Sequence, residues 1–168
     1  MVGVPAPEIV VRPARPDEFR AVGELTTAVY VEGGYVPAGT AYAAALADTA
    51  ARAAHNEIVV AEVGGVLAGA LTITPPSSPF AEVAGPGELE FRLLAVAKEM
   101  RGKGIGTALV RYVLDRAGAD GYRAVTIPTH ESMVEARRIY DRLGFVHARD
   151  TFVGDGIRLT VLTRALSR

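Results

Sequence analysis

Short apolar runs bounded by glycine, proline or polar residues recur along the chain, and this pattern predicts β-strands. The runs are residues 9–11, 57–63, 66–74, 88–96, 122–127, 145–148 and 157–163. The second and third runs are separated only by Gly64-Gly65, a dipeptide that suits the left-handed backbone of a two-residue turn. These two runs therefore predict a hairpin, within a sheet of about seven strands.

Between the strands, apolar positions recur at three- and four-residue spacing, which is typical of a helix with one buried face. Such segments begin at Pro16, near Thr40, at Ile105 and near Ser132. Pro16 is followed by two acidic residues that suit a helix N-terminus. Ser132 is followed at the right spacing by Glu135, which predicts a capping box.

The order of these elements indicates the fold class. It reads β-α-α-β-β-β-α-β-α-β-β, which predicts a mixed α/β fold in a single domain over residues 1–168, with residues 1–8 flexible. A chain of 168 residues that is 49% apolar can bury one sizeable core. The Pro- and Gly-rich connection between residues 75 and 87 is long for a compact domain, which favours a binding role or mobility.

Composition and charge exclude several kinds of chemistry. The chain has no cysteine and only three widely separated histidines, so we expect neither disulfides nor a metal site. A formal net charge of −1 gives no general attraction to nucleic acid or to an anionic membrane. The N-terminal residues lack the features of a secretory signal, and no apolar run approaches the roughly 20 residues that span a bilayer. We therefore expect a cytoplasmic protein that binds neither nucleic acid nor membrane.

A glycine-rich segment between a predicted strand and a predicted helix carries the most informative chemistry. It reads Arg101-Gly102-Lys103-Gly104-Ile105-Gly106-Thr107. Glycines let a ligand approach the backbone closely, and a helix N-terminus offers free N–H groups with partial positive charge. With two basic side chains beside them, these groups predict a site for an anion such as a pyrophosphate.

Residue spacing separates this segment from two other phosphate-binding turns. A P-loop has Ser or Thr directly after Gly-Lys, whereas Lys103 is followed by Gly104. A dinucleotide-binding turn, G-x-G-x-x-G, would need a glycine where Thr107 stands. Neither pattern fits the segment.

Two segments together resemble the Gcn5-related N-acetyltransferases. Arg101, Gly104 and Gly106 match the family's motif A, Arg/Gln-x-x-Gly-x-Gly/Ala, and residues 136–145 resemble its motif B, A-x-x-x-Y-x-x-x-G-F. Residues 11–14 also resemble the family's first strand. The resemblance implies a central, mostly antiparallel twisted sheet of about seven strands, flanked by four helices and splayed at strands 4 and 5.

The resemblance also implies acetyl-coenzyme A as the co-substrate, with no metal. In similar proteins, backbone groups of the fourth strand hold the pantetheine arm, which places Leu94, Ala95 and Val96 beside it here. The amides from Arg101 to Thr107 would hold the pyrophosphate. The apolar alternation of this strand fails at Leu93-Leu94, where either a bulge or entry into a fully buried stretch explains the pattern.

Acetyl transfer to an amine needs groups that move protons. An amine with a pKa of ~10.4 requires roughly 4.6 kcal/mol for deprotonation at pH 7, and a carboxylate can take that proton. Glu90 occupies the strand position where some family members carry their base, although it also fits a solvent-facing strand residue; Glu88 is the second candidate. Tyr140 of motif B would lie near the thioester sulfur and donate a proton to the leaving thiol, although its spacing also fits a core aromatic.

The expected acceptor is a primary amine of a small molecule, an amino acid or a peptide. Tyr30, Tyr35 and His130 are candidates for lining its site, and loop anchoring explains the two tyrosines equally well. The alternative function is an acyl-coenzyme A sensor or a degenerate module without transfer, because Met133 stands where the family often has Asn. Either that amide contact to the cofactor is missing, or Ser132 replaces it. The near-neutral charge disfavours an RNA-directed enzyme. Related folds often pair through edge strands, which makes a homodimer a further hypothesis.

Overall fold

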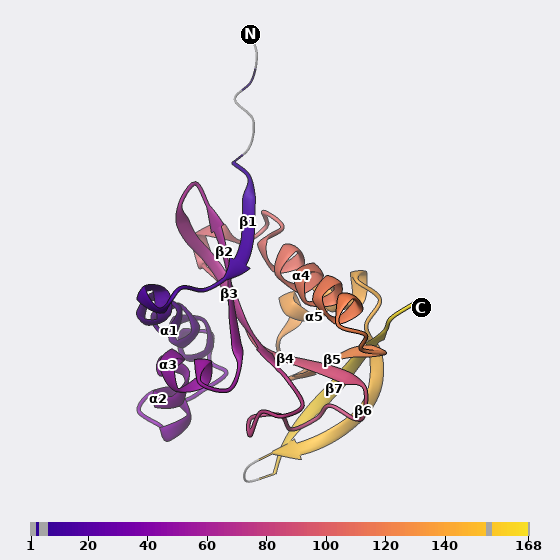
Figure 1. Cartoon of the computed structure of the whole chain (residues 1–168). Coiled ribbons are helices and arrows are strands. Elements are labelled where there is room, and N and C mark those ends of the chain that lie inside the picture. The colour runs from indigo at the N-terminus through magenta and orange to yellow at the C-terminus, as the bar shows by residue number, and fades with distance from the viewer. Residues whose placement is uncertain (1–2, 4–6, 154–155, 168) are drawn as a thin grey trace.

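One seven-stranded sheet runs through the computed structural model, which describes residue 3 and residues 7–153 and 156–167 (Figure 1). Its strands are β1 (Ile9–Pro13), β2 (Glu57–Val63), β3 (Val66–Thr74), β4 (Glu88–Val96), β5 (Ala124–Thr129), β6 (Val146–Val153) and β7 (Ile157–Ala165). Their order is β1-β2-β3-β4-β5-β7-β6, and every neighbouring pair is antiparallel except β4 and β5. The predicted mixed, mostly antiparallel sheet is confirmed. The expected flexibility of residues 1–8 falls largely on residues 1–2 and 4–6, which lie outside the described part of the chain.

Five α-helices flank the sheet, one more than the sequence predicted. They are α1 (Phe19–Thr27), α2 (Ala41–Ala47), α3 (Thr49–Ala53), α4 (Ile105–Ala119) and α5 (Val134–Arg142). The extra helix arises because the alanine-rich segment breaks at Asp48, whose backbone leaves the helical region with ψ at 70°. The Asp48 carboxylate then caps α3 by accepting the Ala51 N–H at 3.1 Å.

The helices form two layers on opposite faces of the sheet (Figure 1). α4 packs its buried side chains, including Leu109 and Val113, against the face that carries Leu89 and Phe91 of β4. α1 packs against the other face, where Val22 meets Ile58, Val60 and Ala70. Because side chains alternate along a strand, Glu90 and Arg92 point to the face opposite α4.

β4 carries the bulge that the sequence offered as one of two explanations. Thr72 pairs with Arg92 and Ala70 pairs with Ala95, so Leu93 and Leu94 together oppose a single residue of β3. Leu93 has a φ of +59°, the only positive value among the described non-glycine residues. The parallel pairing of β4 with β5 ends at Glu90, which pairs with Thr126. The two strands therefore part just before the bulge, as the family resemblance implied.

The local turn predictions have mixed outcomes. The β2–β3 hairpin is confirmed, with both Gly64 and Gly65 at positive φ. The capping box at Ser132 is wrong, because α5 begins at Val134 with Met133 before it and without a side-chain cap. The Ser132 hydroxyl instead lies 2.6 Å from Nδ1 of His130, so it is held within the loop before the helix. None of the described helices has the length and apolar character needed to cross a bilayer.

Candidate active site

The N-terminus of α4 presents unpaired backbone donors in a glycine turn. Gly102 and Gly104 adopt φ values of +78° and +84°, which favour glycine because a side chain is strained there. The first hydrogen bond of the helix runs from the Ala108 N–H to the Gly104 carbonyl at 3.0 Å. The N–H groups of residues 105–107 therefore precede the helical bonds, and no side chain of the described residues caps them. The turn thus has the backbone geometry that the predicted anion site requires.

Positive side chains stand beside these donors. Arg101 and Lys103 are both exposed, and Arg101 is held only loosely, with its Nε 3.9 Å from the Glu135 carboxylate of α5. Such long, exposed pairs contribute little to stability, so Arg101 is free to turn toward a bound anion. The helix dipole and these two charges act in the same direction.

Gly106 brings the two helices of this face close together. A Cβ at Gly106 would lie 2.6 Å from Cδ1 of Ile139 in α5 and 3.6 Å from Cγ2 of Val96 in β4. The first turn of α4, the end of β4 and the middle of α5 therefore meet at this glycine. Tyr140 is the residue after Ile139 and follows it in α5.

Tyr140 is a core aromatic, as one of its two predicted roles required. It is 2% exposed, and its ring lies edge-on to Phe91 with 5.9 Å between centroids and 5.6 Å from the centroid of Phe145. Burial, and secondly the nearby Tyr30, raise the pKa of Tyr140 well above its ordinary 10.0. The hydroxyl has no hydrogen bond within the described residues, so it is a protonated group with a free donor at neutral pH.

Tyr30 joins two irregular pieces of backbone. It lies in a π-helical turn, Ala28–Glu32, and its hydroxyl donates to the Leu94 carbonyl in the β4 bulge at 3.2 Å. Its ring meets Tyr35 edge-on at 6.1 Å between centroids, and Tyr35 is 40% exposed. Burial also raises the pKa of the Tyr30 phenol. π-helical turns are frequent at functional sites, and here the turn holds the bulge.

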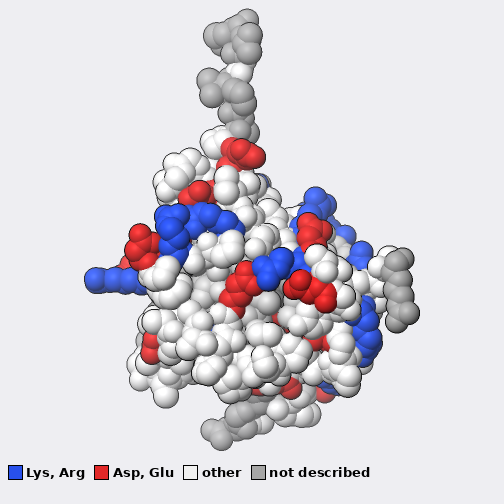
Figure 2. All heavy atoms as spheres, in the orientation of Figure 1, with Lys and Arg blue, Asp and Glu red and all other residues white. Residues whose placement is uncertain are grey.

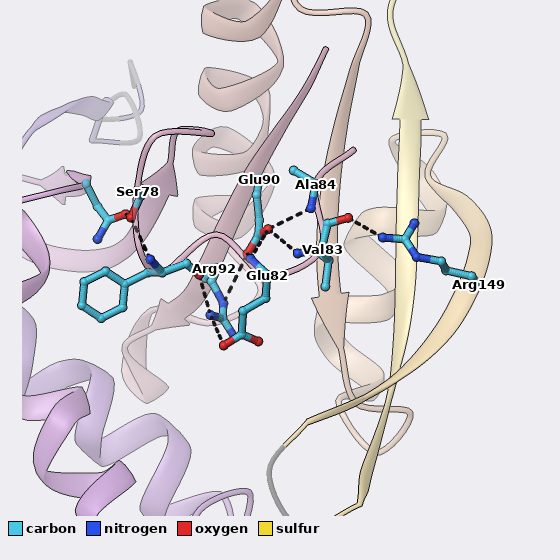
Figure 3. Close-up of polar contacts among 9 residues, drawn as sticks. Ser78, Glu82, Val83, Ala84, Glu90, Arg92 and Arg149 are labelled. Atoms are coloured by element: carbon cyan, nitrogen blue, oxygen red, sulfur yellow. Dashed lines mark hydrogen bonds and ion pairs between the residues drawn. The ribbon is translucent and has the colours of Figure 1, made fainter. Parts of the chain in front are cut away.

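Two other predicted site residues differ in their surroundings. His130 follows β5, and its ring contacts Ser132 of its own loop. Glu90 is 0% exposed, so the interpretation as a solvent-facing strand residue is wrong. The loop before β4 covers it, and Glu90 Oε1 accepts the N–H groups of Glu82, Val83 and Ala84 at 3.1, 2.8 and 3.1 Å (Figure 3).

The charged side chains form neither a one-sign patch on the face drawn in Figure 2 nor a metal-binding cluster among the described residues. On the face drawn in Figure 2, the described basic and acidic side chains lie intermixed. Within residues 7–153 and 156–167, no three His, Asp or Glu side chains converge in a way that could hold a metal ion.

Comparison with known protein sequences gives matches to acetyltransferases. The profile of the Acetyltransferase (GNAT) family matches residues 21–145. N-acetyltransferase family 8 member 2 of Rattus norvegicus is 34% identical over 110 residues, which are 66% of this chain and 47% of that protein. N-acetylaspartate synthetase of Homo sapiens is 38% identical over 78 residues, 45% of this chain and 26% of that protein. The chain thus spans about half the length, or less, of these curated relatives.

Solved structures share the fold over nearly the whole chain. The yncA structure from Salmonella typhimurium, solved with its cofactor acetyl-CoA, has a TM-score of 0.71 at 19% identity and covers 96% of this chain and 95% of its own. A GCN5-related N-acetyltransferase from Kribbella flavida has a TM-score of 0.71 at 24% identity, covering 94% and 98%. At these identities, the likeness establishes the fold.

Proposed function

The chain belongs to the acetyltransferase (GNAT) family, and from this premise we propose that it transfers an acetyl group from acetyl-coenzyme A to a primary amine of a small molecule, amino acid or peptide. One observation carries the proposal: the β4 bulge, the gap between β4 and β5 and the uncapped N-terminus of α4 lie together. A Cβ at Gly106 would lie 3.6 Å from Cγ2 of Val96, so the first turn of α4 packs directly against the end of β4.

The residues at this place fit the parts of acetyl-coenzyme A. The N–H groups of the α4 turn, with Arg101 and Lys103, suit the two charges of a pyrophosphate. Beyond Glu90, β4 no longer pairs with β5. Its residues from Leu94 to Val96 can therefore offer backbone groups to the amides of a pantetheine arm. When bound, the co-substrate supplies the acetyl thioester, and the Salmonella protein that shares this fold was solved with acetyl-CoA as its cofactor.

Tyr140 is the proposed general acid. Its hydroxyl keeps its proton at neutral pH, and burial raises its pKa further above the ordinary 10.0. It has no competing acceptor among the described residues, so it can donate to a leaving thiolate. The edge-on contact with Phe91 and the tilted contact with Phe145 fix the ring, and a fixed donor loses little entropy when it acts.

The proton of the incoming ammonium must leave by another route. Direct transfer to Glu90 would require residues 82–84 to move away, because their N–H groups occupy its carboxylate. We therefore propose that the amine loses its proton to water. Water then acts as the base, the role that the sequence predicted for Glu90.

The names of the relatives guide the choice of acceptors. The human relative is named for making N-acetylaspartate, an acetylated amino acid. A relative from Pseudomonas phage PaMx11 is named 5-NmdU N-acetyltransferase, and it is 33% identical over 66 residues. Amino acids, small amines and short peptides are therefore the first acceptors to test.

The test is release of free thiol from acetyl-coenzyme A in the presence of each amine, with mass spectrometry of the product. Amine-dependent thiol release with an acetylated product supports the proposal. Binding of acetyl-coenzyme A without transfer to any amine in the panel favours the alternative, an acyl-coenzyme A-binding module. Absence of both binding and transfer refutes the assignment of the α4 turn.

A further inference from the structure

Glu90 stands at a distinctive place in the sheet. It pairs with Thr126 in the last register position before β4 and β5 part. It points away from α4, because its neighbours Leu89 and Phe91 both pack in the α4 core. The Glu90 carboxylate therefore lies on the sheet face opposite α4, beside the gap between β4 and β5.

The contacts of Glu90 are those of an anchor for the preceding loop. Oε1 accepts three consecutive backbone N–H groups, those of residues 82–84, at 2.8 to 3.1 Å. Three N–H groups converging on one oxygen form an anion-binding nest, with the carboxylate as the anion. Oε2 lies 3.7 Å from Nε of Arg92, which also reaches Glu82. Oε2 also accepts the Glu82 N–H at 3.4 Å, and with 0% exposure the carboxylate is closed off from bulk solvent.

A second strand holds the same loop from the other side. Arg149 of β6 donates from Nη2 to the Val83 carbonyl, across the sheet from Glu90 (Figure 3). The beginning of the loop is tied down by Ser78, whose hydroxyl donates to Asn56 at 2.8 Å. Residues 82–84 are thus fixed between β4 and β6, beside the point where the sheet opens.

From this geometry we infer that Glu90 is a positioning residue that shapes residues 82–84 into a wall of the acceptor site, and that it does not take the amine's proton. The inference rests on the proposed acetyl transfer. In this arrangement Arg149 shares the task of Glu90, although it lies on a strand distant in sequence. A base must meet the amine or a water, whereas an anchor must remain buried, and Glu90 is buried.

Glu90→Gln and Glu90→Ala separate the two roles. The glutamine carbonyl can still accept the loop N–H groups but cannot take a proton, so we expect kcat to stay within about tenfold of wild type. Loss of a general base would instead cost about 10²–10⁴-fold in kcat. Glu90→Ala leaves the three donors without an acceptor, and we expect the acceptor KM to rise on the order of tenfold or more, since misplaced site walls can cost about 10²-fold. The affinity for acetyl-coenzyme A should not change in either variant.

Two further measurements extend the test, and the second of them requires no activity. Arg149→Met releases Val83 from the opposite side and should raise the acceptor KM in the same direction as Glu90→Ala. The matched control is Arg158→Met, because Arg158 is an exposed arginine that pairs only with Asp150 among the described residues. Hydrogen exchange of the amides of residues 82–84, without any ligand, should be slow in wild type and Glu90→Gln and fast in Glu90→Ala.

Each outcome bears on a different claim. A loss of 10²-fold or more in kcat for Glu90→Gln, with the acid limb of the pH profile abolished and the loop amides still protected, would assign Glu90 as the base and overturn the inference. Unchanged exchange and unchanged acceptor KM in Glu90→Ala would overturn it as well. If the wild-type protein acetylates no amine, the proposed function is refuted, and so is the role of residues 82–84 as a wall of the acceptor site. The exchange data would then still decide whether Glu90 anchors the loop.

Discussion

Removing the Tyr140 hydroxyl should separate activity from stability. In Tyr140→Phe the ring keeps its contacts with Phe91 and Phe145, and no hydrogen bond to a described residue is lost. A typical hydrogen bond contributes about 1 kcal/mol, so the free energy of unfolding should change by less than about 1 kcal/mol. Loss of a general acid should lower turnover by about 10²–10⁴-fold, or about 2.7–5.4 kcal/mol of transition-state stabilisation.

The assay for this variant has three parts. Thiol release at saturating acetyl-coenzyme A and acceptor gives kcat, calorimetry gives the affinity for acetyl-coenzyme A, and urea denaturation gives stability. Tyr112→Phe is the control, because Tyr112 lies on α4 with its hydroxyl 3.3 Å from Nη1 of Arg116, away from the site. Since the pKa of Tyr140 is raised well above 10.0, its ionisation should produce no fall in kcat between pH 7 and 10.

Two results would refute this role. Turnover within a few-fold of wild type would leave Tyr140 as a core aromatic only. An equal loss of stability or of acetyl-coenzyme A binding would show that the hydroxyl supports the structure, and its assignment as the proton donor would fall.

Three further predictions concern the turn, the bulge and acid stability. Gly104→Ala should cost about 1–2 kcal/mol of stability, because φ is +84° and a left-handed residue is strained, and it should weaken acetyl-coenzyme A binding; unchanged urea and calorimetric results would contradict it. Tyr30→Phe removes the hydrogen bond to the Leu94 carbonyl and should raise the KM for acetyl-coenzyme A; an unchanged KM would show that this bond does not shape the co-substrate site. The hydrogen bond from Arg12 lowers the pKa of Glu18 from 4.5 to about 2, so stability should fall as pH falls from 4.5 toward 2. In Glu18→Gln, urea midpoints should lose that part of the pH dependence, and an unchanged slope would contradict it.

The sequence predicted best the features that depend on neighbouring residues. The Gly64-Gly65 turn, the glycine turn before α4 and the failed alternation at Leu93-Leu94 are all local, and the structure contains all three. Asp48 was missed because an alanine-rich helical pattern continues on both sides of it. A short acidic side chain that can cap the next helix was the available signal.

The surroundings of Glu90 could not be predicted in the same way. Its partners are backbone N–H groups of a Pro- and Gly-rich loop, and side-chain periodicity says nothing about where such a backbone runs. The Arg149 contact to Val83 joins residues 66 positions apart. The Tyr30 bond to Leu94 spans 64 positions, so it too depends on the assembled sheet and helices.

The most direct test of the central claim is a calorimetric titration of the protein with acetyl-coenzyme A, with ATP and NAD titrated under the same conditions. A saturable, one-to-one heat signal for acetyl-coenzyme A that neither nucleotide reproduces is the expected result. No binding of acetyl-coenzyme A, or equal binding of all three ligands, would contradict the assignment of the α4 turn and the β4 gap to this co-substrate.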